Sequence, residues 1–244
     1  MKVIGVIPAR WGSTRFEGKV LALIAGKPMI EHVWLRVKKS KILNDIIIAC
    51  DDEKVLKTAV QFGAKAVLTS PNHPSGTDRI AEVVKDLDVD IVVNIQGDEP
   101  LIQHAVIDNL ANALMSDQSA VMSTVIKRLE KQEELDNPNV VKAVIDEESN
   151  ALYFSRAAIP YNRDKKDFKA LTYYKHLGIY AYRKNFLLKL KDLPPSLLEK
   201  TEKLEQLRVL EAGYKIKAIL TDLETIGVDT KEDLKLVEAI LQKG

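Results

Sequence analysis

The first half of the chain alternates short apolar runs with segments of helical periodicity, and this alternation restricts the fold more than any other feature. Continuous apolar runs are typical of parallel strands covered on both faces, and here they are Val3–Ile7, Ile46–Cys50, Ala64–Leu68 and Ile91–Ile95. Apolar residues recur at helical spacing after each run, in segments that begin near Pro28, Val55, Thr77 and Ala105. The repeated strand–helix pattern predicts an α/β fold with a mostly parallel, doubly wound sheet between two layers of helices.

The pattern changes after about residue 119, where strands follow one another with little helix between them. The predicted strands are Val121–Ile126, Val140–Ile145, Leu152–Ser155 and Leu177–Tyr182. Asp146–Asn150 consists of turn-forming polar residues and predicts a hairpin. Helices return at about Ser196–Ala212 and Lys231–Leu241. Because no linker separates the halves, we interpret residues 1–244 as a single domain with a mixed-sheet insertion at about 119–183.

Composition excludes several classes of partner. Lys and Arg number 36 against 35 Asp and Glu, so the formal charge is +1, which provides no global field for nucleic acid or an anionic membrane. No apolar run approaches the ~20 residues that span a bilayer, and the N-terminal run is too short for a secretion signal. Cys50 is the only cysteine, so no intramolecular disulfide can form. These features predict a cytoplasmic protein that binds neither nucleic acid nor membrane.

The loop after the first strand has the composition of an anion site. Its cations, hydroxyls and glycines are Arg10, Gly12, Ser13, Thr14, Arg15, Gly18 and Lys19. The cations and hydroxyls can donate hydrogen bonds to phosphate oxygens, and the glycines let the backbone approach them. The spacing matches neither the Walker P-loop nor the G-x-G-x-x-G dinucleotide turn. Because ligands of doubly wound sheets bind outside the carboxyl ends of the strands, this loop predicts a polyphosphate site.

Two aspartates also follow apolar segments that end at a turn. The apolar run Ile91–Ile95 leads into Gln96-Gly97-Asp98-Glu99-Pro100, and Asp229 ends the run Thr225-Ile226-Gly227-Val228-Asp229. Mg²⁺ on a nucleotide takes one or two carboxylates while phosphates and waters complete its shell. Asp98 is therefore the expected metal ligand. For Asp229, a role in the first turn of the following helix is nearly as well supported by these residues alone.

Taken together, these motifs resemble those of the 3-deoxy-manno-octulosonate (KDO) cytidylyltransferase family. The segments that carry the resemblance are Ile7–Arg10, Ser13–Arg15, Gly18–Lys19, Ser75–Arg79, Asn94–Pro100, Leu152–Arg156, Ile159–Pro160, His176–Tyr180, Leu204–Arg208 and Gly227–Thr230. They run through essentially the whole chain in order. Phe16-Glu17 departs from the Leu-Pro usual in the family, and the polar segment Asn162–Thr172 matches poorly.

The resemblance implies a nucleotidyltransferase-like three-layer α/β/α fold and an activity. Members of the family join the anomeric hydroxyl of KDO to the α-phosphorus of CTP and release pyrophosphate, for lipopolysaccharide biosynthesis. The implied cofactor is Mg²⁺, the implied substrates are CTP and KDO, and the implied assembly is a homodimer formed through the mixed-sheet insertion.

The resemblance also implies roles for individual residues. The catalytic residues would be Arg10, Lys19, Asp98 and Asp229, the last two as metal ligands. The nucleotide would be bound by Ala9, Arg10, Ser13, Thr14, Lys19, Ser75, Gly76, Arg79 and Gln96. The acid sugar would be bound by Gln96, Arg156, His176, Tyr180, Glu205 and Gln206.

Each of these roles has a structural rival. Ser75 and Asp78 also have the spacing of a helix capping box. Alternation along a strand puts His176 and Tyr180 on one face, where they could equally form a hydrogen-bonded core pair. Among functions, a sialic-acid type cytidylyltransferase, a GT-A-like glycosyltransferase and a non-catalytic sugar-nucleotide sensor remain alternatives.

Overall fold

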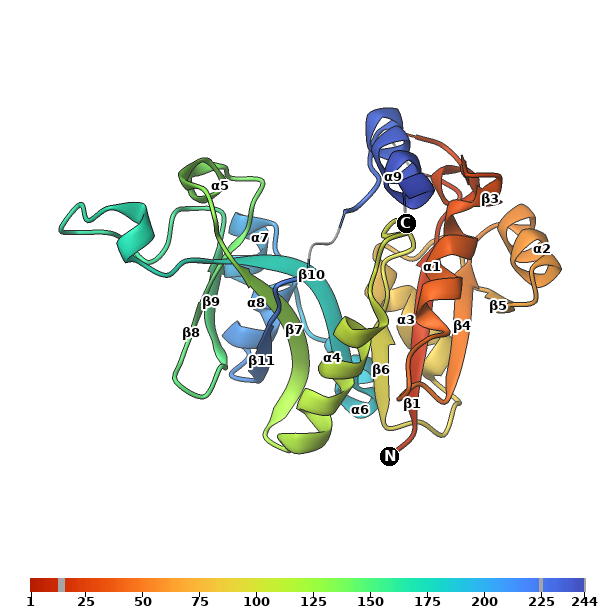
Figure 1. Cartoon of the computed structure of the whole chain (residues 1–244). Coiled ribbons are helices and arrows are strands. Elements are labelled where there is room, and N and C mark those ends of the chain that lie inside the picture. Colours follow the sequence, from red (N-terminus) through yellow and green to blue (C-terminus); the bar gives the residue numbers. More distant parts are fainter. Residues whose placement is uncertain (13–15, 224–225, 244) are drawn as a thin grey trace. The chain divides into compact units, whose positions relative to one another are not determined.

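The computed structural model describes residues 1–12, 16–223 and 226–243 of the chain (Figure 1). The predicted phosphate-loop residues Ser13, Thr14 and Arg15 lie outside the described residues. The chain divides into two compact units, Met1–Ala111 with Glu224–Gly244, and Asn112–Leu223. The predicted insertion, 119–183, lies inside the second unit.

The first unit is built on four parallel strands, as the apolar runs predict. In sheet order they are β6 (Ile91–Asn94), β1 (Val3–Ala9), β4 (Asp45–Cys50) and β5 (Lys65–Leu68). The chain moves outward from β1 to β4 and β5, and then returns across β1 to β6. The order of the strands therefore reverses beside β1, and in a parallel sheet this is the point where ligands bind at the carboxyl ends.

Helices connect these strands. They are α1 (Met29–Val37), α2 (Glu53–Gln61) and α3 (Gly76–Val84), and α4 (His104–Ser116) follows β6. Because right-handed crossovers run in opposite directions along the sheet for α1 and α3, these two helices cover opposite faces. Five residues of β1 are almost completely buried: Val3, Ile4, Val6, Ile7 and Ala9. This burial explains why the strand reads as a continuous apolar run.

The C-terminal helix α9 (Lys231–Lys243) packs on the first unit. A buried cluster joins Val228 and Val237 to Leu101, to Met29 of α1 and to Ile24 of the short hairpin β2 (Leu23–Ile24) and β3 (Lys27–Pro28). The sequence does not mark this hairpin. Its packing fixes the segment that precedes α9, which contains Asp229.

The second unit contains the mixed sheet. Its central strand β7 (Ala120–Arg128) pairs antiparallel with β10 (Tyr174–Arg183) and parallel with β11 (Lys215–Leu220). β8 (Lys142–Ile145) and β9 (Ala151–Ser155) form the predicted hairpin, and β8 also pairs with β10. At the turn, Asn150 donates its backbone N–H to the Asp146 carboxylate at 2.7 Å. Helical segments of this unit include α5 (Gln132–Asp136), α6 (Lys184–Leu190) and the 3-10 turn Phe168–Ala170.

One predicted helix is wrong in detail. Ser196–Ala212 is not continuous but forms α7 (Leu197–Glu202) and α8 (Gln206–Glu211). The break is at Lys203, whose backbone is left-handed with a φ of 56°, a conformation that ends a helix. None of the helices in the described part of the chain is both long enough and apolar enough to cross a membrane.

Candidate active site

A cleft of about 290 Å³ opens at the carboxyl ends of β1 and β6 in the first unit. Its lining residues are Pro8, Arg10, Gly12, Lys19, Val20, Gly76, Gln96, Gly97 and Asp98. The structure thus brings Arg10, Lys19, Gly76, Gln96 and Asp98 to one place. Ala9 ends β1 and is buried beneath the cleft.

Lys19 lies at the centre of the charged groups of this cleft. Its Nζ is 2.8 Å from Oδ2 of Asp98 and 3.1 Å from Oδ1 of Asp229. The Lys19 side chain is only 11% exposed, against 35% for Asp98 and 54% for Asp229. Partial burial alone would lower the pKa of Lys19, but hydrogen bonds and charges from the two aspartates outweigh it and raise that pKa. Two carboxylates far apart in sequence therefore converge on one cation that stays charged.

Backbone contacts hold the two aspartates in place. The N–H of Val228 donates to the carbonyl oxygen of Asp98 at 2.8 Å, so the two turns are tied together. Thr230 and Asp233 cap α9 reciprocally, with Thr230 N–H donating to Asp233 at 2.8 Å and Asp233 N–H donating to the Thr230 hydroxyl at 3.2 Å. Because this pair satisfies the helix terminus, the carboxylate of Asp229 is not needed there and reaches Lys19.

Glu99 follows Asp98 but turns into the protein. It is 8% exposed, and its Oε2 has no hydrogen-bond partner among the described residues. Burial, with a smaller contribution from the charge of Asp98, raises the pKa of Glu99 to about 8. A carboxyl group in this state is mostly protonated at neutral pH and is a poor metal ligand.

This pKa predicts a pH-dependent stability. The folded state holds the Glu99 proton more tightly than the unfolded state. The contribution of this proton to the free energy of unfolding is therefore complete below about pH 4.5 and is lost as the pH rises towards about 8. Glu99→Gln is expected to remove a slope of about 1.4 kcal/mol per pH unit within that window. Urea unfolding of the parent and the variant between pH 5 and pH 8, with EDTA present, measures the slope. Parallel stability curves for the two proteins would contradict the prediction.

Gly97 is required by the close packing of the acidic turn. A Cβ at this position would lie 2.9 Å from the backbone oxygen of Pro8 and 3.3 Å from Cδ1 of Ile30. Because a backbone atom cannot move aside alone, Gly97→Ala is expected to shift the turn that carries Asp98.

We expect Gly97→Ala to cost about 1–3 kcal/mol of stability and also to lower turnover per folded molecule. Gly5→Ala is the matched control, since its Cβ would meet the flexible ends of Ile95 and Leu43 at 2.8 and 2.9 Å, within the β1 core. The control should lose stability and keep its turnover. Equal turnover in the two variants would show that the packing at Gly97 does not position Asp98.

Trp11 joins the two ends of the loop that the sequence predicts to bind phosphate. Its carbonyl oxygen accepts the N–H of Gly18 at 2.9 Å, and its indole N–H donates to Glu17 at 3.0 Å. Its own backbone N–H donates to Asp51 at 2.8 Å. Glu17 is half of the Phe16-Glu17 departure from the family pattern, so in this chain the position contributes a hydrogen bond that closes the loop. Arg10 is exposed, with no ion-pair partner among the described residues.

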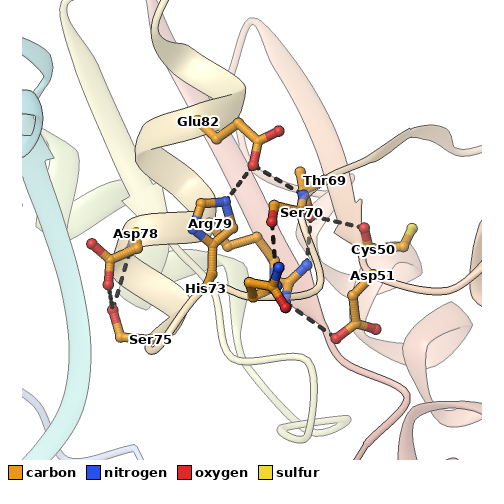
Figure 2. Close-up of polar contacts among 10 residues, drawn as sticks. Cys50, Asp51, Thr69, Ser70, His73, Ser75, Asp78, Arg79 and Glu82 are labelled. Atoms are coloured by element: carbon orange, nitrogen blue, oxygen red, sulfur yellow. Dashed lines mark hydrogen bonds and ion pairs between the residues drawn. The ribbon is translucent and has the colours of Figure 1, made fainter.

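Arg79 does not face the cleft. Its side chain is fully buried, with Nη2 3.1 Å from the Asp51 carboxylate and Nη1 2.5 Å from the Thr69 hydroxyl (Figure 2). The expected direct contact with a nucleotide is therefore replaced here by an ion pair with the residue that holds the Trp11 backbone. Ser75 accepts the Asp78 N–H at 3.1 Å and caps α3, and a role of Ser75 in nucleotide binding stays a prediction.

A second polar cluster lies in the second unit and contains three of the predicted sugar-binding residues. Tyr180 donates to Gln206 at 3.2 Å, and Gln206 is 3.3 Å from Nδ1 of His176. The ring centroids of His176 and Tyr180 are 5.4 Å apart. Burial lowers the pKa of His176 to about 3, so the ring is neutral at physiological pH. Glu205 immediately precedes α8, and its negative charge contributes to a raised pKa of Tyr180 after the larger effect of burial.

Arg156 follows β9, and its backbone N–H donates to the Glu202 carboxylate at 3.0 Å, whereas its guanidinium donates to carbonyl oxygens. Its Nε donates to the carbonyl oxygen of Glu202 at 2.7 Å and its Nη1 to that of Pro138 at 3.0 Å. Because carbonyl oxygens do not neutralise the guanidinium, its charge is available to a carboxylate ligand. The carbonyl oxygen of Arg156 in turn accepts from Lys142, a fully buried lysine.

Sequence reasoning missed Asp51, Thr124 and Lys142. The sequence does contain an indication that Asp51 belongs to the site, since this residue follows an apolar run as Asp98 does. Thr124 and Lys142 stand in strands whose alternation does not distinguish a buried polar residue from an exposed one. Among the described residues no group of three or more His, Cys, Asp or Glu side chains gathers as a metal site.

Comparison with known proteins gives a consistent result. Residues 4–218 match the family model described as Cytidylyltransferase. The chain is 49% identical to a 3-deoxy-manno-octulosonate cytidylyltransferase of Geotalea daltonii and 50% identical to that of Geotalea uraniireducens, and in both cases the alignment covers all of both chains.

Solved structures agree with the sequence matches. A CMP:2-keto-3-deoxy-manno-octonic acid synthetase in complex with CTP superposes with a TM-score of 0.94 at 39% identity, covering 100% of this chain and 99% of that one. A 4-diphosphocytidyl-2C-methyl-D-erythritol synthase from Anaerococcus prevotii, at 17% identity, has a TM-score of 0.63 and covers 99% of this chain and 96% of its own. The second likeness concerns the fold alone.

Proposed function

Because this chain belongs to the family of 3-deoxy-manno-octulosonate cytidylyltransferases, we propose that it transfers a cytidylyl group from CTP to KDO, forming CMP-KDO and pyrophosphate. The observation that carries the proposal is the convergence of Asp98 and Asp229 on Lys19 in a cleft that Arg10 also lines. Such a site combines cations for a triphosphate with two carboxylates for a divalent ion.

In the proposed reaction the anomeric oxygen of KDO forms a bond to the α-phosphorus of CTP as the bond to the pyrophosphate oxygen breaks. Displacement of this kind depends mainly on positioning and charge neutralisation. Arg10 and Lys19 bind the negative phosphates. Both side chains line the cleft at the carboxyl ends of the strands, which is where we propose that the triphosphate binds.

Mg²⁺ is the cofactor that the family implies, and the residues present fit it. Two hard oxygen ligands from separate turns lie within 3.1 Å of one ammonium group, and Mg²⁺ needs only one or two carboxylates beside substrate phosphates. When bound to Asp98 and Asp229, the ion would neutralise charge that develops on the phosphates. Turnover should stop with EDTA and return with added MgCl₂.

For the acid sugar we propose Arg156 as the carboxylate ligand, with Gln96, His176, Tyr180, Glu205 and Gln206 as ligands of its hydroxyls. The guanidinium of Arg156, which donates to carbonyl oxygens, and the hydrogen-bonded cluster around His176 support this assignment. We also propose, by the family likeness, that the enzyme acts as a cytoplasmic homodimer. Sedimentation equilibrium of the purified protein would test the dimer.

The test of the function is a pyrophosphate-release assay with CTP and KDO, with CTP and sialic acid, and with a CMP-sugar donor. We expect release with CTP and KDO, and little release with CTP and sialic acid. A glycosyltransferase would instead consume a CMP-sugar donor without releasing pyrophosphate, and a sensor would bind CTP without turnover. Release of pyrophosphate with sialic acid in preference to KDO would contradict the proposal and favour a sialic-acid type cytidylyltransferase.

A further inference from the structure

Thr124 lies on the central strand β7 and is fully buried. It contacts His176 of the polar cluster that His176, Tyr180 and Gln206 form. Its Oγ1 is 2.9 Å from the carbonyl oxygen of Ile179 and 2.7 Å from Nε2 of His176. The close approach of both groups results from an irregularity of β10 between His176 and Tyr180, where Gly178 adopts a φ of 69°. No motif of the sequence points to this threonine.

The chemistry of these two contacts determines where the protons are. A carbonyl oxygen can only accept, so the single hydroxyl proton of Thr124 goes to Ile179. The hydroxyl must then accept from His176, which places the proton of the neutral ring on Nε2. Nδ1 of His176 is consequently an acceptor.

The same reasoning extends outward along the cluster. Since Nδ1 of His176 accepts, the Gln206 group 3.3 Å away must be its NH₂. The amide oxygen of Gln206 then faces Tyr180 and accepts its hydroxyl proton at 3.2 Å. All the hydrogen bonds point one way, from Tyr180 towards the carbonyl oxygen of Ile179.

We infer that Thr124 is a positioning residue that sets the direction of every hydrogen bond between His176 and Tyr180. With its proton committed to Gln206, the Tyr180 oxygen can only accept a hydrogen bond from a ligand. It therefore faces a hydroxyl group of the bound sugar acid and not its carboxylate. This second part rests on the proposed function, whereas the direction of the bonds does not.

The direction of these hydrogen bonds can be measured without substrate. In protein labelled with ¹⁵N-histidine, the ¹⁵N shifts separate protonated from unprotonated ring nitrogens, and couplings to Hδ2 and Hε1 distinguish Nδ1 from Nε2. The signals of His176 are those missing from His176→Gln. We expect a neutral ring with its proton on Nε2 from pH 5 to pH 8. A proton on Nδ1 in the parent protein would overturn the inference without any substitution at Thr124.

Variants of Thr124 test the causal step. Thr124→Val keeps the shape and removes the acceptor, so the ring proton is expected to move to Nδ1, while Thr124→Ser restores the hydroxyl and the parent tautomer. The Nε2 tautomer persisting in folded Thr124→Val would contradict the role of Thr124.

Kinetics then test the orientation of the sugar. Reversal of the hydrogen bonds turns the Tyr180 hydroxyl into a donor. Loss of one matched hydrogen bond lowers binding affinity roughly tenfold. We expect Thr124→Val to raise the KM for KDO by about that factor and to leave the KM for CTP unchanged. A switched tautomer with an unchanged KM for KDO would overturn the placement of the sugar hydroxyl on Tyr180. If KDO is not a substrate at all, the proposed function fails while the tautomer result stands.

Discussion

Asp98→Asn is expected to lower kcat/KM by about 1,000-fold, because several kcal/mol of transition-state stabilisation depend on charge neutralisation at the phosphates. Asparagine keeps the size of the side chain and one oxygen ligand but removes the negative charge that a divalent cation requires. Lys19 keeps Asp229 as its partner at 3.1 Å, so the fold is expected to persist. Initial rates of pyrophosphate release across a Mg²⁺ series measure the effect.

Two further variants make this result specific. Asp229→Asn should lower turnover as well, and the double variant should lose much less than the product of the two single losses, because both residues serve one cation. Asp86→Asn removes an exposed carboxylate of the same unit and is expected to retain parental turnover. Near-normal activity of Asp98→Asn at saturating Mg²⁺ would exclude the proposed metal site.

Asp51→Ala is expected to destabilise the first unit by about 3–5 kcal/mol, since it leaves a buried charge without its partner. Arg79 has no exposed surface, and its Nε already lacks a hydrogen-bond partner among the described residues. The substitution also removes the acceptor for the Trp11 N–H. We therefore expect a raised KM for CTP in the fraction that remains folded.

Tryptophan fluorescence during urea unfolding reports this loss directly. The chain's two tryptophans, Trp11 and Trp34, both belong to the first unit. Glu53→Ala is the control, because it breaks an ion pair with Lys57 in which both side chains are about 70% exposed, 69% and 72%, and such pairs contribute less than about 1 kcal/mol. If Asp51→Ala cost no more than this control, the Arg79 ion pair would not be what stabilises the strand ends.

Much of the first unit could be predicted from local pattern. Strands β1, β4, β5 and β6 are covered on both faces and so appear as uninterrupted apolar runs, and the loop cations and Asp98 follow two of them. The small hairpin β2–β3 escaped notice, because two strands of two residues each leave no periodicity. The break between α7 and α8 was missed for a related reason. A single left-handed lysine at position 203 carries no sequence signal of the kind that glycine provides.

The site residues divide in the same way. The positions of Lys19 and Asp98 followed from the rule that parallel strands bring their carboxyl ends together. The position of Asp229 required the docking of α9, and the burial of Arg79 on α3 depends on Asp51 and Thr69, which follow β4 and β5. These contacts join residues far apart in the chain, so no local pattern contains them.

The alternation of apolar runs and helices thus determined, by itself, a parallel sheet with a cationic loop at its edge, because periodicity reports which face of each element is buried. Only the tertiary structure decided that Asp98 and Asp229 share one ammonium group, that Arg79 turns away from the cleft and that Thr124 directs the hydrogen bonds of His176. Each of these depends on distances of about 3 Å between side chains from different elements. Packing sets such distances, and spacing along the chain does not.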